Sequence, residues 1–302
     1  MTIKSLVTGG AGFIGSNLAL ELERQGHEVV VTDNFQSANP NNLNGFKGQV
    51  ISADISTEFD FKEKFDLIFH QAAITDPRHP NDEETYSKNV DGFKKIIALA
   101  DRDGAKLVYA STAGLYGNGP VPMKEDQPKE VLTVYGRSKL KMDEMAEELF
   151  AKRHIVGLRY FNVFGPREAH KGRPASMIYH LYHQMKEGHR PRIFNWGEQI
   201  RDFIYVKDVV LANLKAVEAP SGIYNVATGV GTSFNELIRV LNEVLGTSFE
   251  PDYFPMPYDS KTYQSNTQGD ITWAKSQLGF TAEWELKKAI QDYLEWLKKN
   301  ED

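Results

Sequence analysis

The sequence of 302 residues contains no cysteine. Disulfide bonds, a thiol nucleophile and every cysteine-ligated zinc or iron–sulfur site are therefore excluded. An excess of positive charge is also missing, because 35 lysine and arginine residues stand against 41 aspartate and glutamate residues, a formal net charge of −6. No overall basic field attracts nucleic acid or an anionic membrane, so neither is expected as a partner.

Long apolar segments are absent as well. No uninterrupted apolar run approaches the ~18 residues of a membrane span. The first eight residues carry one lysine and too short an apolar core for a signal peptide, so a cytoplasmic protein is expected. Hydrophobic residues make up 41% and charged residues 25%, as in ordinary globular proteins. At roughly 150 residues per domain, about two domains are predicted.

Short β-type runs alternate with helical patterns in the first half of the chain. This alternation predicts an α/β fold with a doubly wound parallel sheet of the Rossmann type. The strands are apolar throughout, as is typical of a sheet buried on both faces. The expected strands are residues 3–8, 28–33, 49–53, 66–70, 106–111 and 154–159, and the expected helices are residues 13–25, 83–100 and 134–152.

The alternation ends after Tyr160, where glycine and proline interrupt a long loop. A second, smaller C-terminal substrate lobe is predicted from the more irregular remainder. The chain after Tyr160 is expected to contain few regular elements: a strand over 201–206 and helices over 175–186, 207–217 and 286–299. The resulting division assigns residues 1–165, with about 196–220 returning to them, to a dinucleotide-binding domain, and about 166–195 and 221–302 to a substrate-binding domain.

The first strand runs into Gly9, Gly12 and Gly15, spaced as G-x-x-G-x-x-G, and then into a helix. Glycine permits the tight turn, the close approach of a pyrophosphate and the packing of helix on strand. The helix N-terminus, at Phe13 and Ile14, offers unpaired N–H groups to phosphates. This strand–turn–helix context predicts dinucleotide binding.

The second strand ends at Asp33 and Asn34, about 20 residues after the glycines. An acid at this point can bind both ribose hydroxyls of an adenosine, and it repels a 2′-phosphate. No lysine or arginine occurs from 34 to 46, although Lys47 follows. NAD is therefore predicted, with NADP as the alternative. The next two strand ends are expected to hold the adenine and to approach the cofactor closely, through Asp54, Ile55, Gln71, Ala72 and Ala73.

Tyr135 and Lys139 form Y-x-x-x-K near the start of a helix, and this spacing places both side chains on one face. The lysine ammonium is expected to lower the pKa of Tyr135, which can then take a hydroxyl proton while hydride leaves the carbon. Such pairs arise often by chance. The hydroxyl pair Ser111-Thr112, at the end of an upstream strand, favours the catalytic interpretation.

Together these segments resemble the extended short-chain dehydrogenase/reductase family, specifically its nucleotide-sugar epimerases. The resemblance covers nearly the whole chain and includes the motif R-Y-F-N-V-F-G-P at 159–166 and R-D-F-I-Y-V at 201–206. It implies Tyr135 as acid/base, Lys139 as its partner and Thr112 as the hydroxyl that orients the substrate oxygen. It also implies Asn89 and Val163 on the cofactor side, a nucleotide-diphosphate sugar as substrate, and a homo-oligomer.

Two further segments, 165–172 and 263–268, are similar to those of ADP-glycero-manno-heptose 6-epimerases. The similarity implies Lys171 as a second acid/base group, which suits an inversion in which hydride leaves and returns on opposite faces. Glu168 and His170 are expected to order this loop. Arg173 stands where that subfamily usually has a small polar residue, which leaves the sugar open. The implied substrate positions are Asn162, Arg173, His180, Phe194 with the rest of 194–197, Arg201 and Tyr263.

Other activities stay open. A UDP-hexose 4-epimerase normally lacks the segment His170-Lys171-Gly172. A 4,6-dehydratase is expected to carry Asp and Glu where Ala113 and Gly114 follow Thr112. A cofactor-sensing protein on the same fold often loses the tyrosine or the lysine, and both are present. No metal is expected, because the pair His180 and His183 has no acid–histidine cluster nearby.

Overall fold

A seven-stranded parallel sheet forms the centre of the computed structural model, which describes residues 2–57, 59–76, 79–257 and 263–300. Its strand order is β11-β6-β5-β4-β1-β2-β3, and every neighbouring pair is parallel. The predicted α/β class with a doubly wound parallel sheet is therefore confirmed. The strands are β1 (Lys4–Thr8), β2 (Glu28–Asp33), β3 (Gln49–Ser52), β4 (Leu67–His70), β5 (Lys106–Thr112), β6 (Ile155–Tyr160) and β11 (Gly222–Val226).

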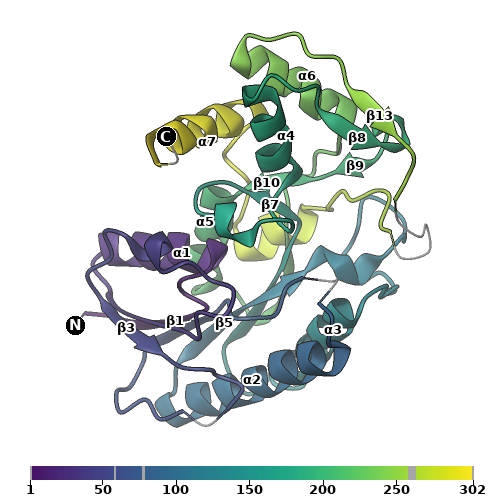
Figure 1. The fold of residues 1–302 in the computed structure, drawn as a ribbon. Helices are drawn as coiled ribbons and strands as arrows, with labels where there is room; N and C mark the ends of the chain where they lie inside the picture. Colours follow the sequence, from purple (N-terminus) through teal and green to yellow (C-terminus); the bar gives the residue numbers. More distant parts are fainter. Residues whose placement is uncertain (1, 58, 77–78, 258–262, 301–302) are drawn as a thin grey trace.

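Helices cover both faces of this sheet (Figure 1): α1 and α5 lie on one face, and α2 and α3 on the other. Their ends follow from local sequence. Asn81 caps α2 by accepting a hydrogen bond from the backbone N–H of Glu84 at 3.0 Å, and Gly104 ends it with a φ of +69°, which glycine adopts without strain. The helices are α1 (Phe13–Arg24), α2 (Asp82–Asp103), α3 (Val134–Glu147) and α5 (Val206–Ala216).

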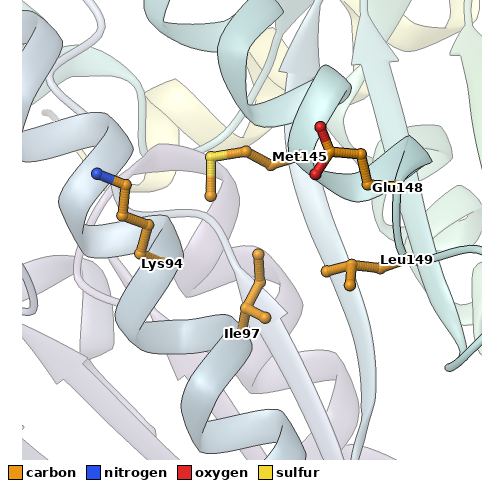
Figure 2. A pocket seen from close by; sticks show the side chains of 5 residues that line it. All are labelled: Lys94, Ile97, Met145, Glu148 and Leu149. Carbon is orange, nitrogen blue, oxygen red and sulfur yellow. The ribbon is translucent and has the colours of Figure 1, made fainter.

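Two apolar layers hold these helices on the sheet. Leu6 and Val7 are successive residues of β1, and they point into different layers, as the alternation of a strand requires. A small hollow lies between α2 and the end of α3 (Figure 2), and it is lined by none of the residues predicted for the site. Its lining consists of Lys94, Ile97, Met145, Glu148 and Leu149.

A separate apolar cluster forms the core of the upper part of Figure 1, where α4, α6 and α7 gather. Three two-stranded pairings, β7 with β10, β9 with β12 and β8 with β13, lie between these helices and the main sheet or beside them. The helices are α4 (Met177–Lys186), α6 (Phe234–Leu245) and α7 (Leu286–Asn300), and the short strands are β7 (Asn162–Phe164), β8 (Arg192–Phe194), β9 (Ile200–Arg201), β10 (Phe203–Tyr205), β12 (Thr232–Ser233) and β13 (Asp252–Phe254).

Most predicted elements are confirmed within a few residues, and the differences lie in the second half. The expected strand 201–206 is interrupted between β9 and β10, and its last residue already begins α5. The sequence did not predict α6 or β11. β11 follows residue 221, where the predicted substrate-binding segment begins, yet it pairs with β6 as the outermost strand of the main sheet.

Among the described helices, none is long and apolar enough to span a membrane.

Candidate active site

Most of the predicted cofactor-side residues, with Thr112, lie along the carboxyl edge of the sheet. Thr8 is in register with both Thr32 and His70, so β1, β2 and β4 end at the same level. Thr112 ends β5 opposite Tyr160 of β6. In open α/β sheets this edge is where ligands bind.

The glycine-rich turn follows β1 and is too tight for side chains. Gly9 has a φ of +65°, and a Cβ atom there would lie 2.7 Å from Ala72. A Cβ atom on Gly15 would lie 2.2 Å from the carbonyl oxygen of Gly9. α1 then begins at Phe13 and Ile14 with no side-chain cap and no acid in its first turn, so its free N–H groups and positive end fit a pyrophosphate.

Asp33 is held rigidly beside this turn. One carboxylate oxygen accepts a hydrogen bond from the N–H of Ala11 at 3.1 Å, and the other accepts one from Phe35 at 2.9 Å. Burial raises the pKa of Asp33, and these two backbone hydrogen bonds limit the rise. The carboxylate therefore has the fixed position that recognition of ribose hydroxyls requires.

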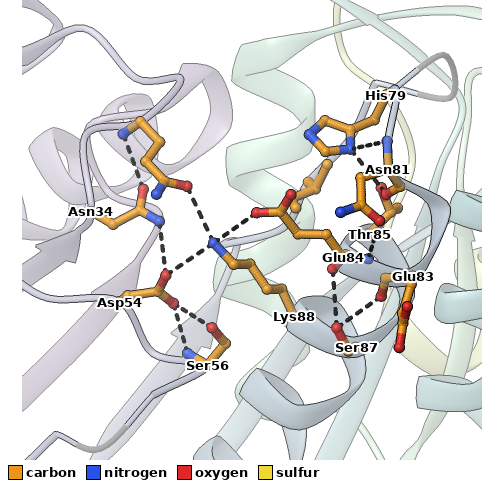
Figure 3. Close-up of polar contacts among 12 residues, drawn as sticks. Asn34, Asp54, Ser56, His79, Asn81, Glu83, Glu84, Thr85, Ser87 and Lys88 are labelled. Atoms are coloured by element: carbon orange, nitrogen blue, oxygen red, sulfur yellow. Dashed lines mark hydrogen bonds and ion pairs between the residues drawn. The ribbon is translucent and has the colours of Figure 1, made fainter.

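A lysine from α2 lies close to this region, although the sequence pointed to Lys47. The ammonium of Lys88 lies 3.4 Å from a carboxylate oxygen of Asp54 and 3.0 Å from one of Glu84 (Figure 3). The side-chain amide of Asn34 lies 3.5 Å from the same Asp54 oxygen. Two carboxylates thus already surround the Lys88 amine.

The segment after β4 is fixed by side chains from other elements. Asn89 of α2 accepts a hydrogen bond from the N–H of Ile74 at 2.8 Å and donates to the hydroxyl of Ser138 on α3 at 2.9 Å. Gln71 donates to Asn213 of α5 at 3.0 Å and accepts from the Tyr160 hydroxyl at 3.1 Å. The structure also places Ala72 against the glycine turn, Ala73 half-buried in the same segment, and Ile55 in the apolar layer under α2.

Tyr135 and Lys139 of α3 face the end of β5. The Thr112 hydroxyl accepts a hydrogen bond from Gly114 at 3.0 Å and hydrogen-bonds the Tyr135 side chain. The Lys139 ammonium lies 6.0 Å from the centre of the Tyr135 ring and donates to the carbonyl of Ala110 at 2.9 Å. The structure thus brings together the three residues predicted for proton transfer.

The pKa of Tyr135 differs from the expectation. Burial raises it to about 12, and the hydrogen bond from Thr112 offsets only part of that rise. The reason is that the Lys139 amine is also buried, which lowers its own pKa to about 8, and it is directed at a carbonyl rather than at the phenol. With this pKa, Tyr135 is protonated at neutral pH and is the acid form.

A buried ion pair anchors this end of α3 to the sheet. Arg159 of β6 and Asp143 of α3 lie 2.9 Å apart, and their side chains are 2% and 1% exposed. Asp143 also accepts from Tyr109 of β5 at 2.9 Å, and Arg159 donates to Tyr116 at 3.0 Å. Because Asp143 is one helical turn beyond Lys139, this network sets the position of the catalytic face.

We expect Arg159→Met to lower the free energy of unfolding by about 3–5 kcal/mol, because Asp143 then stays buried without its cation. The double variant with Asp143→Leu should recover most of this loss, since no charge is left buried. Urea unfolding measures both. The exposed pair Arg24–Glu21 supplies the control: Arg24→Met should leave stability nearly unchanged, because solvent screens this pair. Equal effects of the two arginine variants would contradict the expectation.

The predicted substrate positions fall into two groups. Arg201 is 9% exposed and donates to the Tyr263 hydroxyl at 2.6 Å and to the carbonyl of Ser265 at 2.8 Å, so it orders the segment after 262. The rings of Phe194 and Tyr263 lie 5.4 Å apart. By contrast, Asn162 accepts from Thr267, and Arg173 is exposed, with its carbonyl in contact with His180 at 3.3 Å. Val163 lies in β7, half-buried.

Further aromatic side chains, some of them exposed, lie beside Phe194, whose ring is 5.8 Å from that of Phe254. Trp196 is 72% exposed and has a φ of +57°, and its ring lies 5.5 Å from that of Tyr253. Arg192 lies over the Phe254 ring at 5.0 Å. A hollow beside them is lined by Trp196, Tyr253, Phe254, Pro255 and Met256. The sequence pointed to Trp196 only as part of the range 194–197.

Lys171 ends a short helical turn, Ala169–Lys171. Its ammonium lies 5.3 Å from the centre of the Phe13 ring, at the start of the cofactor helix. Burial lowers the pKa of Lys171, and the nearby carboxylate of Glu168 opposes this. Glu168 is fully buried and accepts hydrogen bonds from Gly165 and Ser176, so its expected role in ordering the loop agrees with its contacts.

Neighbouring groups are structural. The imidazole of His70 contacts the Thr8 hydroxyl at 2.8 Å, and burial lowers its pKa to about 3, so it is neutral. Among the described residues, no group of three or more histidine, aspartate or glutamate side chains could hold a metal ion.

The parallel sheet, the glycine turn, the fixed acid and the Tyr135–Lys139 pair define a dinucleotide-dependent enzyme that moves protons and hydride. The chain belongs to the NAD dependent epimerase/dehydratase family, whose model matches residues 5–227. It is therefore an NAD-dependent epimerase, an isomerase, as the sequence predicted.

Individual relatives match nearly the whole chain. The ADP-L-glycero-D-manno-heptose-6-epimerase of Brachyspira hyodysenteriae is 37% identical, over 98% of both chains. The crystal structure of the enzyme of that name from Helicobacter pylori is 39% identical, with a TM-score of 0.93 over 98% of this chain and 96% of that one. The UDP-glucose 4-epimerase of Thermotoga maritima is 29% identical, with a TM-score of 0.90 over 99% and 100%.

Proposed function

We propose that this enzyme is an ADP-glycero-manno-heptose 6-epimerase, which inverts carbon 6 of the sugar. The observation that carries the proposal is a second amine of lowered pKa, that of the half-buried Lys171, beside the cofactor helix. It occurs in a chain that is 39% identical over 98% of its length to a solved heptose epimerase. A buried lysine exchanges protons near neutrality more readily than an exposed one.

NAD, held at the strand ends by the glycine turn and Asp33, would supply the chemistry for removing a hydride from carbon 6 of the sugar and returning it. Because the two transfers use opposite faces of that carbon, an acid/base group is useful on each side. Tyr135 and Lys171 are proposed for these roles: each holds or releases the proton of the sugar oxygen. Thr112 orients the Tyr135 hydroxyl through its hydrogen bond, and Lys139 holds the nicotinamide ribose.

On the substrate side, we propose that Arg201 and Arg173 contact the diphosphate. Arg201 is preorganised by its hydrogen bonds to the 263–265 segment, which lowers the entropy lost when phosphate binds. The aromatic group around Phe194, Trp196 and Tyr263 offers faces on which a nucleobase can stack. Asn162 and His180 complete the proposed substrate set.

NMR of the purified enzyme with added NAD tests this function. With the ADP-activated manno-heptose, signals of the opposite configuration at carbon 6 should appear until equilibrium. UDP-glucose should stay unchanged. Conversion of UDP-glucose to UDP-galactose, with no change of the heptose, would replace the proposal by a 4-epimerase. NAD binding without conversion of either sugar would indicate a cofactor-sensing protein without catalytic activity.

We expect NAD to bind at least about ten-fold more tightly than NADP, because Asp33 and the carboxylates around Lys88 repel a 2′-phosphate. Titration of cofactor-free protein with both dinucleotides measures the ratio. Asp33→Asn should reduce the preference. Asp60→Asn, at an exposed acid paired with Lys62, should not. Equal or tighter binding of NADP by the unaltered protein would contradict the expectation.

Three organisational features belong to the same proposal. Residues 1–165 and about 196–220, with β11 added, form the cofactor-binding domain, and most of the remainder binds the sugar nucleotide. The enzyme works in the cytoplasm, where nucleotide sugars are made. It assembles into a homo-oligomer.

A further inference from the structure

Asn42 links three segments of the active site that are distant in the sequence. It lies in the short helical turn Pro40–Leu43 and is 7% exposed. Its amide nitrogen lies 3.0 Å from the carbonyl oxygen of Ala11, 3.3 Å from that of Arg167 and 3.1 Å from Nδ1 of His170. One buried amide thus contacts both the glycine-rich turn and the loop that carries Lys171.

Arg167, in the 165–172 loop, makes a second set of hydrogen bonds between this loop and the segment around Asn42. Its guanidinium donates to the backbone carbonyl of Asn42 at 3.0 Å and to the side chain of Asn17 at 3.2 Å. Asn17 in turn donates to the carbonyl of Pro166 at 2.9 Å. Arg167 has a φ of +73°, a conformation that costs a non-glycine residue free energy and persists only where the surroundings impose it. These hydrogen bonds supply that restraint.

The two ends of this connection are groups with proposed roles in the reaction. Ala11, whose carbonyl contacts Asn42, donates its N–H to the Asp33 carboxylate at 3.1 Å. At the other end, His170 directly precedes Lys171, whose ammonium lies over the Phe13 ring. A continuous path of hydrogen bonds therefore joins the proposed ribose-binding acid to the turn that holds the proposed second acid/base.

We propose that Asn42 is a positioning residue that fixes the 165–172 loop, and with it Lys171, to the cofactor-binding turn. The proposal rests on the proposed role of Lys171. Its consequence is coupling: binding of NAD at the turn and placement of Lys171 stabilise each other through the Asn42 amide. Asn42→Ala removes the amide that contacts both the glycine-rich turn and the 165–172 loop, and it keeps a Cβ atom at this position of the turn.

The first test is a double-mutant cycle on turnover with saturating sugar nucleotide. Asn42→Ala should lower kcat by roughly ten-fold or more, since small displacements of a catalytic group are costly. In a Lys171→Met background the same substitution should have almost no further effect, because the group it positions is gone. Asn41→Ala, at the exposed neighbouring residue, should leave kcat unchanged. Losses that multiply in the double variant would overturn the proposal.

The second test does not depend on activity. Tryptic cleavage after the half-buried Lys171, followed by mass spectrometry, reports opening of the loop. Saturating NAD should slow this cleavage in the unaltered protein and in Asn41→Ala, and should have little effect in Asn42→Ala. Cleavage that NAD does not slow in the unaltered protein would overturn the coupling. If instead Lys171→Met leaves kcat intact, the proposed acid/base role fails, and the NAD-dependent cleavage still decides whether Asn42 ties the loop to the turn.

Discussion

Tyr135→Phe should lower kcat by at least about 10²-fold while folding and NAD binding stay intact. The substitution removes only the phenolic oxygen, which Thr112 orients and which is the proposed proton donor and acceptor. The ring is kept, so its place beside the Lys139 ammonium should be unchanged. NMR of epimerisation, thermal unfolding by circular dichroism and titration with NAD measure the three properties separately.

Tyr86→Phe provides a matched control, because Tyr86 is a 38%-exposed tyrosine on α2. The Tyr86→Phe variant should have the same kcat as the unaltered enzyme. Near-normal turnover by Tyr135→Phe would remove Tyr135 from the mechanism. A loss of NAD binding in that variant would mean that the hydroxyl serves the cofactor and not the sugar oxygen.

Lys171→Met should reduce kcat with saturating substrate by about 10²-fold, because a proton can no longer be exchanged on that side of the sugar. Methionine fills a similar volume beside Phe13, so the loop should stay packed. If Lys171 served only to neutralise the diphosphate, KM would rise while kcat stayed nearly intact. Steady-state kinetics over a wide range of substrate concentration distinguish the two roles.

Lys171→Arg separates charge from proton exchange at the same position. Arginine keeps the positive charge, but its pKa is too high for it to give up a proton near neutrality. The arginine variant should therefore be nearly as slow as Lys171→Met. Full recovery of kcat by arginine would contradict the two-base proposal and leave Tyr135 as the sole acid/base. It would favour a mechanism in which the oxidised sugar rotates within the site before the hydride returns.

The parts of this site that the sequence predicts are those encoded within one strand–turn–helix unit. Gly9, Gly15 and Asp33 act through backbone geometry and strand ends, which a short segment determines. Tyr135 and Lys139 share one face because of helical spacing alone. The fold follows in the same way, since the alternation of strands and helices in the first half fixes a parallel sheet.

The residues that sequence reasoning missed are brought together by tertiary contacts. Lys88 of α2 reaches Asp54, which follows β3, and Asn42 contacts His170 although 128 positions separate them. No local periodicity signals such pairs. The pKa of Tyr135 also could not be predicted from the sequence, because it depends on where the Lys139 amine points and on how far each group is removed from solvent.

Two missed elements differ in how well they could have been predicted. α6 carries clear signals: Ser233 caps its first turn, Gly246 ends it with a φ of +68°, and its buried residues recur at helical spacing. β11 has only five residues and contains a glycine and an asparagine, which depresses strand propensity. Its place in the sheet comes from pairing with β6.

β11 also covers β6 along the margin of the sheet, where it pairs with five of the six buried residues of that strand. Until Val226 has left the ribosome, β6 presents a row of unpaired N–H and C=O groups on an apolar strand. Such a margin is a template for pairing with another chain. At about 5–20 residues per second, synthesis of the intervening segment takes several seconds. The nascent chain is therefore most exposed to misassembly after its cofactor-binding turn has formed and before its last parallel strand arrives.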